Sequence, residues 1–303
     1  MTTASNSILV VGGDSLVGSA VTKALKDQGK QVFSTTRQRQ TLGHDRLFLD
    51  FELPGSLVIP EGVSSALIIA AATNYDRCER DPQARVINVD LIPRLAKSLF
   101  EQGLHVTFIS TNSVFGGETA WPTEDALHAP GIPYAQQKSD GERAIREAAA
   151  ELGASNRLCV TRLTKILATD TSPIPAWRDN WSRGQSVEPF ADLVFAPISV
   201  NFVGQSLAHI GELRLPGNFH LSGSENVSYV AFAKAIAKKL GISLSLIQPT
   251  TSIEKGVHIA FKPTYSGIGM ERTTSLTGIT PQPLDQVLDD LFPDHPTEQG
   301  NRS

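Results

Sequence analysis

The first half of the chain alternates short apolar runs with amphipathic stretches. The short runs, many of them rich in β-branched residues, predict buried strands at 8–11, 31–34, 47–49, 67–71, 106–110 and 158–162. Apolar positions at helical spacing predict helices at 16–27, at 82–100 with a break at Pro93, and at 134–152 after Pro133. Strands that alternate with helices in this way predict βαβ units and a parallel sheet.

Beyond Lys165 this rhythm changes, and proline and glycine become frequent. A helix at 203–210, a strand at 219–221 and a helix at 227–240 are expected there. The fold class predicted is therefore α/β, with a Rossmann-type doubly wound parallel sheet and a smaller C-terminal lobe.

The bulk composition is that of an ordinary globular protein, with 40 % hydrophobic and 19 % charged residues. The net charge is −4 and no basic run occurs, so neither nucleic acid nor a membrane surface is expected as a partner. The N-terminus lacks the features of a secretory signal, and we expect a cytoplasmic protein. Cys78 and Cys159 have no metal or redox spacing and the histidines are isolated, so no metal site is predicted.

A glycine-rich turn lies between the first strand and the first helix. A helix N-terminus offers unpaired N–H groups to a pyrophosphate, so Gly12, Ser15, Leu16 and Val17 are candidate cofactor contacts. Ser15 stands where the usual pattern has its middle glycine, and its hydroxyl could hydrogen-bond a phosphate oxygen. The alternative is a tight turn that binds nothing, but the flanking strand and helix favour a dinucleotide.

The end of the second strand carries Arg37 and, further on, Arg39, but no acidic residue. A guanidinium there suits the 2′-phosphate of a ribose, which favours NADP(H) over NAD(H). The alternative is that Arg37 is a solvated loop charge. Asp50, after the third strand, either accepts a hydrogen bond from the adenine amino group or only forms a turn.

Tyr134 and Lys138 lie four residues apart and so share one face of a predicted helix. A phenol has a pKa near 10, and an ammonium group held nearby would lower that pKa and make the phenol a useful proton carrier. The segment Ser110-Thr111-Asn112-Ser113 closes the fifth strand, where a hydroxyl can orient a substrate carbonyl. The alternatives are two surface residues on an amphipathic helix and a hydroxyl that only caps the loop.

These pieces together resemble the extended short-chain dehydrogenase/reductases and, more narrowly, the dTDP-4-dehydrorhamnose reductase family. The likeness covers about residues 8–240. It rests on the segments 12–18, 70–73, 78–82, 88–90, 110–117, 122–125, 134–142 and 219–223. The middle segments are the more specific ones, because the glycine motif and the Tyr-x-x-x-Lys spacing occur throughout the superfamily.

The resemblance implies a role for each site residue. Thr111 would polarise a sugar carbonyl, Tyr134 would donate a proton, and Lys138 would bind the nicotinamide ribose. The cofactor would be lined by Ala70, Ala71 and Ala72. Substrate contacts would come from Thr73, Ser113, Lys165 and Arg178. The substrate would be a nucleotide-linked 4-keto sugar, and family habit suggests a homodimer.

The chain departs from the family pattern at two places. Asn112 and Ser113 stand where the family has Asp and Tyr after the catalytic Thr. They cannot supply the acid that dehydratases need, which favours a reductase. Lys165 stands where the family has a tryptophan near the sugar, so either it meets an acidic group on the substrate or it is solvated.

The resemblance also divides the chain into an NADP-binding domain at residues 1–165 and a substrate-binding lobe mainly at 166–303. Some segments, at about 195–240, would return to the core. In the lobe, Arg178 and Arg183 are either ligands of the substrate diphosphate or exposed charges. The function predicted is an NADPH-dependent reductase of a nucleotide-linked keto sugar. The alternatives are a non-catalytic NADP-binding regulatory subunit and a nucleotide-sugar epimerase.

Overall fold

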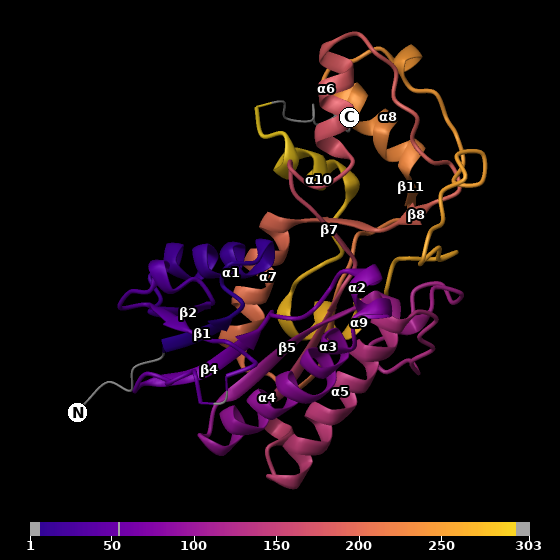
Figure 1. Ribbon diagram of the computed structural model, residues 1–303. Coiled ribbons are helices and arrows are strands. Elements are labelled where there is room, and N and C mark those ends of the chain that lie inside the picture. Colours follow the sequence, from indigo (N-terminus) through magenta and orange to yellow (C-terminus); the bar gives the residue numbers. More distant parts are fainter. Residues whose placement is uncertain (1–6, 54, 295–303) are drawn as a thin grey trace.

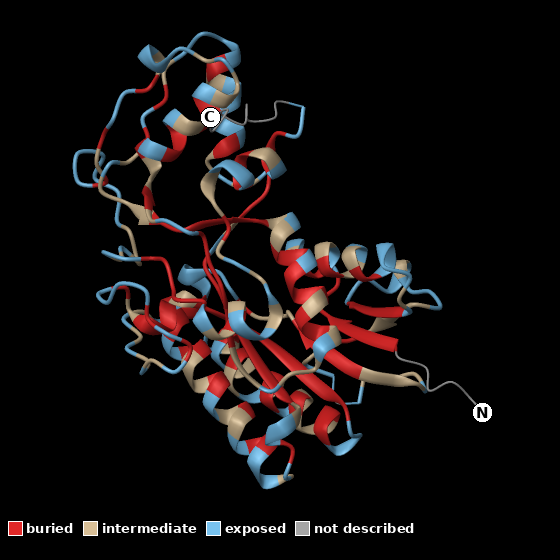
Figure 2. Ribbon diagram, turned by 180° about the vertical axis from the view of Figure 1, so that it is seen from behind, coloured by how far each residue is buried: buried red, intermediate tan, exposed pale blue. Residues whose placement is uncertain are grey.

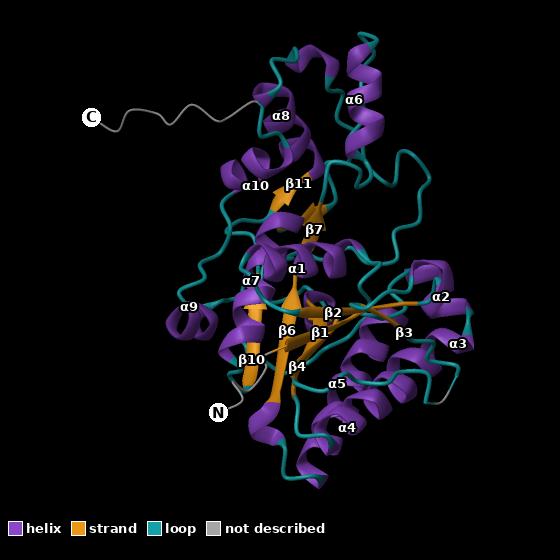
Figure 3. Ribbon diagram, turned by 90° about the vertical axis from the view of Figure 1, so that its left-hand side faces the viewer, coloured by secondary structure: helices purple, strands orange, loops and turns teal. Residues whose placement is uncertain are grey.

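A seven-stranded parallel sheet forms the centre of the molecule. The computed structural model describes residues 7–53 and 55–294. The strand order is β10-β6-β5-β4-β1-β2-β3 (Figures 1 and 3). These strands are β1 (Ser7–Val11), β2 (Val32–Thr36), β3 (Arg46–Phe48), β4 (Val63–Ile68), β5 (His105–Thr111), β6 (Leu158–Leu163) and β10 (Gly217–Leu221). The order reverses between β1 and β4, and ligands of doubly wound sheets bind at such a reversal.

Helices cover both faces of this sheet. α4 (Ile92–Glu101) and α5 (Pro133–Glu151) pack on one face, and α1 (Leu16–Asp27) and α7 (Val200–Leu213) pack on the other. Successive residues of each strand alternate between the two cores, as Leu9 and Val10 show. Both faces of the central strands are therefore buried, as Figure 2 shows, whereas the edge strand β3 is half-buried. This explains why the strands appear in the sequence as continuous apolar runs.

The segment before α4 is helical but irregular. α2 (Tyr75–Arg80) and α3 (Pro82–Arg85) lead into a π-helical turn, η2 (Val86–Leu91), which runs directly into α4. The expected break at Pro93 thus appears as a π-helical turn just before it. α5 packs closely on this turn, because a Cβ atom on Gly141 would lie 2.7 Å from the carbonyl oxygen of Asn88.

The lobe lies beyond the carboxyl ends of the strands (Figure 1). Its core joins α6 (Ile174–Ser182), α8 (Tyr229–Lys239) and α10 (Leu284–Leu291) around Trp177, Trp181 and Phe232. Two small sheets pair β7 (Lys165–Leu167) with β9 (Pro197–Ser199), and β8 (Val194–Phe195) with β11 (Val227–Ser228). The remaining short helices are α9 (Glu271–Thr277), η1 (Arg39–Thr41), η3 (Asn112–Phe115), η4 (Ser155–Arg157) and η5 (Leu244–Leu246). Within 195–240, α7 and β10 lie with the large sheet, whereas α8 packs in the lobe. The domain boundary at 165 stays a prediction.

The secondary structure expected from the sequence is confirmed in type for each predicted strand and helix of the first half, with shifted ends. The first helix has the predicted bounds, but β4 ends at Ile68 rather than at Ala71. β4 ends there because the N–H groups of Ile69 and Ala70 both turn to the carbonyl oxygen of Val11. Within the described residues, no helix is long and apolar enough to cross a membrane. The same residues contain no cluster of three or more His, Cys, Asp or Glu side chains that could hold a metal.

Candidate active site

The glycine-rich turn presents the N-terminus of α1 at the point where the strand order reverses. Gly12 has φ +93°, and a Cβ atom there would lie 2.8 Å from the backbone nitrogen of Ala70. Ser15 caps α1, because its Oγ accepts from the Gly18 N–H at 3.0 Å and donates to the Gly12 carbonyl at 2.8 Å. The hydroxyl that was expected to bind phosphate is therefore used inside the turn. The N–H groups of the first helical residues, Leu16 and Val17, have no acceptor within the helix.

An acidic side chain from another segment lies at the end of β2, and the local sequence did not reveal it. Asp14, from the glycine-rich turn, accepts a hydrogen bond from the Thr36 hydroxyl at 2.7 Å and pairs with Arg46. Arg37 is exposed, and the Arg39 guanidinium lies 4.0 Å from the centre of the Phe48 ring. The statement that no acid is available at this strand end was wrong, because a residue distant in the sequence reaches it.

Asp50 forms the turn that was one of its two expected roles. Its Oδ1 accepts from the Glu52 N–H at 3.0 Å, and its carbonyl oxygen accepts from the Ser56 hydroxyl at 2.9 Å. A contact between Asp50 and an adenine stays a prediction.

The alanines after β4 are held in place by one buried side chain. Asn88, from the π-helical turn, accepts from the Ala72 N–H and donates to the Ala72 carbonyl, both at 2.9 Å. Its amide nitrogen also donates to Gln137 of α5 at 2.9 Å. Asn88 therefore ties the predicted cofactor-lining segment, Ala70 to Ala72, to the helix that carries Tyr134. No spacing signal in the sequence assigned this role to Asn88.

Tyr134 lies buried at the carboxyl ends of β4 and β5. Its ring packs with Ala72, Cys78 and Ala84, and its centre lies 5.1 Å from that of the Tyr75 ring. Burial raises the pKa of the phenol well above its usual value, and the nearby Tyr75 adds to the shift, while a hydrogen bond with Thr111 opposes it. The expected lowering of this pKa is therefore not what the structure shows. The phenol stays protonated, which suits a proton donor.

Lys138 is also buried, one helical turn beyond Tyr134 on the same face of α5. Its ammonium group donates to the Ile109 carbonyl at 2.7 Å and lies 4.1 Å from the centre of the Phe108 ring. Burial lowers the pKa of this ammonium group to about 8, although Glu142 acts in the opposite direction. Lys138 is thus held against Phe108 and Ile109, close to the end of β5 at Thr111.

Thr111 ends β5 and caps the following 3-10 turn. Its hydroxyl lies 3.1 Å from the Ser113 hydroxyl and accepts from the Ser113 N–H at 3.2 Å. Ser113 has no exposed surface, so in the structure it orients Thr111, and its direct contact with substrate stays a prediction. The Oδ1 of Asn112 accepts from the Thr111 hydroxyl at 3.4 Å, and its amide nitrogen donates to the Ser266 carbonyl at 2.8 Å, which fixes a C-terminal segment beside the site.

A buried ion pair anchors the helix that carries the Tyr and the Lys. Glu142, the next residue along the face of Tyr134 and Lys138, accepts two hydrogen bonds from Arg162 of β6, at 3.0 and 2.8 Å. Both side chains are almost completely buried. Arg162 also donates to the Glu124 carbonyl at 3.0 Å, which ties the loop before α5 to the sheet.

The remaining predicted substrate residues are accessible, and the structure places them apart. Lys165 begins β7, two residues beyond Leu163, which lies opposite Thr111 in the sheet. Lys165 is exposed but has protein around it, and this desolvation lowers its pKa. Thr73 is exposed next to the alanine segment. Arg178 is exposed on α6 with its guanidinium 5.8 Å from the centre of the Phe292 ring.

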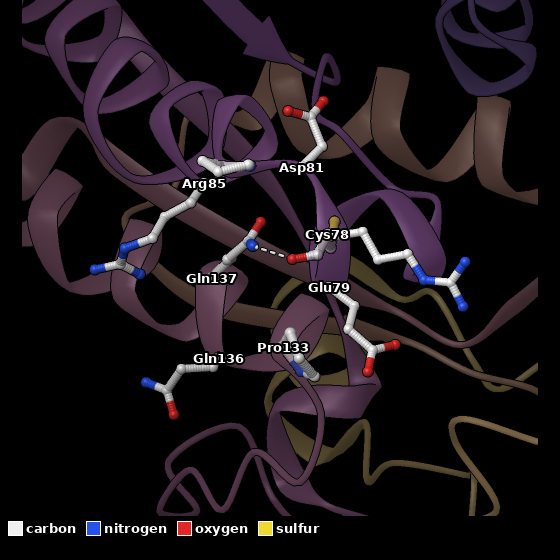
Figure 4. Close-up of a pocket in the computed structure, with 9 residues that line it drawn as sticks. Cys78, Glu79, Asp81, Arg85, Pro133, Gln136 and Gln137 are labelled. Atoms are coloured by element: carbon white, nitrogen blue, oxygen red, sulfur yellow. Dashed lines mark hydrogen bonds between the residues drawn. The ribbon is translucent and has the colours of Figure 1, made fainter.

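Two cavities lie among the described residues, and neither is lined by Thr111, Tyr134 or Lys138. One, of about 290 Å³, lies between α2, α3 and α5 (Figure 4), and its lining includes Gln137, which donates to the Cys78 carbonyl at 2.8 Å. The other, of about 240 Å³, lies in the lobe and has mainly apolar and aromatic walls. These walls come from Ser172, Pro173, Trp177, Glu188, Pro189, Phe190, Leu193 and Tyr229.

Comparison with known proteins gives the family. The sequence profile of the RmlD substrate binding domain matches residues 6–295. The chain therefore belongs to this family of extended short-chain dehydrogenase/reductases, and it is an oxidoreductase. Figure 1 shows the arrangement in this chain, a parallel sheet below a smaller lobe.

Three relatives are identical to this chain at about a quarter of the aligned positions. The probable low-salt glycan biosynthesis reductase Agl14 of Haloferax volcanii is 26 % identical over 79 % of this chain and 82 % of its own. The dTDP-4-dehydrorhamnose reductase of Escherichia coli is 27 % identical over 81 % of this chain and 84 % of its own. Methionine adenosyltransferase 2 subunit beta of Rattus norvegicus is 24 % identical over 82 % and 76 %.

Solved structures have the same fold. The dTDP-4-dehydrorhamnose reductase of Bacillus anthracis, in complex with NADP, superposes with a TM-score of 0.79 at 19 % identity and covers 95 % of this chain and 99 % of its own. The dTDP-glucose 4,6-dehydratase DesIV of Streptomyces venezuelae, with NAD bound, has a TM-score of 0.74 at 18 % identity and covers 91 % and 92 %.

Proposed function

We propose that this protein is an NADPH-dependent reductase of a keto sugar carried on a nucleotide. The observation that supports the proposal is that Tyr134, with a hydrogen bond to Thr111, and Lys138, with a hydrogen bond to Ile109 of β5, lie buried on one face of α5. The names of the relatives support the same class of reaction.

Each of the three residues has a role in the proposed reaction. The Thr111 hydroxyl orients the carbonyl oxygen of the sugar, and Ser113 holds that hydroxyl in place. Tyr134 donates its phenolic proton to the carbonyl oxygen and is left as a phenolate. Lys138 binds the nicotinamide ribose, and its positive charge stabilises the phenolate. The reduced nicotinamide, when bound, supplies the hydride.

The residues present fit a nicotinamide dinucleotide. The N–H groups of Leu16 and Val17, which have no acceptor within their own helix, suit a pyrophosphate at the end of a helix. The segment from Ala70 to Ala72 follows β4 on the other side of the reversal in strand order, where it would line the nicotinamide half. The positive charge after β2, including Arg37, favours NADP(H).

The proposed substrate lies between the sheet and the lobe. Tyr229 lines the lobe cavity. It also lies near enough to Tyr75 to raise the pKa of that phenol, although burial is the larger cause of the rise. Tyr75 in turn packs on Tyr134. Tyr75 thus lies between the proposed proton donor and Tyr229 of the lobe cavity, and we propose that the nucleotide is held on this side of the site. Contacts of Thr73, Lys165 and Arg178 with the substrate stay predictions, as do a homodimer and a cytoplasmic location.

A second candidate is a regulatory subunit that binds NADP without turning it over. The similarity to methionine adenosyltransferase 2 subunit beta favours it. The complete set of Thr111, Tyr134 and Lys138 favours the reductase instead, because a regulatory role needs none of them. An epimerase is a third candidate, and it would retain its nicotinamide through purification where a reductase exchanges it.

The test is to mix the purified protein with NADPH and a panel of nucleotide-linked keto sugars. The reductase proposal expects oxidation of NADPH with at least one sugar, and loss of this turnover but not of NADPH binding in Tyr134→Phe. NADPH binding with no turnover of any sugar, equal in the wild type and the variant, would favour the regulatory candidate.

A further inference from the structure

The glycine-rich turn and the end of β2 are joined by a set of hydrogen bonds. The Gly12 N–H donates to the Thr35 hydroxyl at 2.9 Å, and the Gly13 N–H donates to the Thr35 carbonyl at 3.1 Å. The Thr36 hydroxyl donates to Asp14 at 2.7 Å. The carboxylate of Asp14 is therefore fixed at the strand end where the adenosine ribose of a dinucleotide lies in this fold.

Arg46 reaches the same place from the next strand. It lies opposite Ser34 in the parallel pairing of β2 with β3, below the strand end. Its Nη2 donates to Asp14 and, at 3.3 Å, to the Thr41 hydroxyl. Asp14 and Thr41 therefore hold the guanidinium group at the rim of the proposed cofactor site.

The guanidinium group of Arg46 has unused donors. Its Nε is buried and has no acceptor among the described residues. Within that part of the chain, Arg46 donates only through Nη2, although a guanidinium group carries five N–H donors. Nε is out of reach of a ligand, but the side chain is 35 % exposed and its unused Nη1 donors are not buried, so a phosphate oxygen, which suits a guanidinium group well, can be bound there.

We propose that Arg46 recognises the 2′-phosphate of the adenosine ribose, and that Asp14 opposes this preference. This inference rests on the proposed dinucleotide site. It adds Arg46 and Asp14 to Arg37 as residues that set the preference for the 2′-phosphate. Asp14 positions Arg46 but brings a negative charge beside the phosphate. A ribose without the phosphate would instead donate its 2′-hydroxyl to Asp14.

The test is calorimetric binding of adenosine 2′,5′-bisphosphate and of 5′-AMP, with the ratio of the two affinities as the readout. Arg46→Gln is expected to weaken binding of the bisphosphate by about tenfold to a hundredfold and to leave 5′-AMP binding nearly unchanged. Arg46→Lys keeps the charge but loses the fork, so its ratio is expected to be intermediate. Asp14→Asn keeps an acceptor for Arg46 and removes the repulsion, so its ratio is expected to rise severalfold.

The matched control is Lys26→Gln, which removes a neighbouring cation that pairs with Asp45 at the surface. It is expected to leave the ratio unchanged. Retained 5′-AMP binding shows that each variant is folded. The proposal is overturned if Arg46→Gln has the same ratio as Lys26→Gln, or if the wild type does not prefer the bisphosphate. Either result leaves the proposed reductase standing, because NADH could then be its cofactor. Failure to reduce any keto sugar would not change the binding ratio.

Discussion

Replacing Glu142 by Gln removes the negative partner of a buried arginine. Glu142 accepts from Arg162 Nε at 3.0 Å and from Arg162 Nη2 at 2.8 Å, and both side chains are almost inaccessible. The amide offers one acceptor in place of two and no charge, so the Arg162 guanidinium stays buried without its negative partner and keeps only neutral ones, such as the Glu124 carbonyl. Breaking a buried pair in this way costs about 3–5 kcal/mol, a large part of the stability of an ordinary protein.

The pKa of Glu142 gives an independent magnitude. Burial alone would raise this pKa, but the hydrogen bond and charge of Arg162 outweigh burial and lower it to about 2, against an ordinary 4.5. That gap corresponds to roughly 3 kcal/mol, since each pH unit is worth about 1.4 kcal/mol. A carboxylate with a lowered pKa stabilises the fold above pH 4.5, and this contribution is lost as the pH falls from there towards 2.

The assay is urea unfolding followed by circular dichroism, from neutral to acidic pH. The matched control is Glu151→Gln, the same change on the same helix, where the carboxylate pairs with Lys97 in solvent. We expect Glu142→Gln to lower the free energy of unfolding by about 3–5 kcal/mol at neutral pH and to flatten its decline below pH 4.5. We expect Glu151→Gln to match the wild type. Equal unfolding free energies in the two variants would refute the reasoning.

The other predictions concern α5 and the site that it carries. The value of kcat/KM is expected to fall as the pH rises through about 8, because Lys138, whose pKa burial lowers to about 8, then loses the charge that stabilises the Tyr134 phenolate; a flat profile to pH 10 would contradict this role. Gly141→Ala is expected to lower the melting temperature, since its Cβ would lie 2.7 Å from the Asn88 carbonyl and overpacking costs about 1–3 kcal/mol. Gly131→Ala, which adds a Cβ in open space, is its control and is expected to be neutral.

The local parts of the fold could be predicted from the sequence. Helix α1 was placed between its true ends because its apolar spacing and the glycine-rich turn agree. The shared face of Tyr134 and Lys138 followed from helical periodicity, since both lie on α5. The strands of the large sheet were recognised because their burial on both faces makes continuous apolar runs.

The other features of the site depend on contacts between residues that are distant in the sequence, and hydrophobic periodicity does not predict such contacts. Asn88 acts on Ala72 through an amide that carries no spacing signal. Asp14 reaches the end of β2 from another turn, so the local sequence around Arg37 could not reveal it. The rise in the Tyr134 pKa depends on the burial of its ring. One signal was present, because a glycine inside a helical pattern, such as Gly141, indicates close approach of another backbone.

The most direct test of the proposed reaction uses NADPH that carries deuterium at the transferred position of its nicotinamide. After incubation with the purified protein and a nucleotide-linked keto sugar, the product is examined by NMR. The account predicts one deuterium on the carbon that was the carbonyl, and no labelled product from Tyr134→Phe in the same time. Formation of an alcohol without deuterium at that carbon, or equal labelling by the variant, would contradict it.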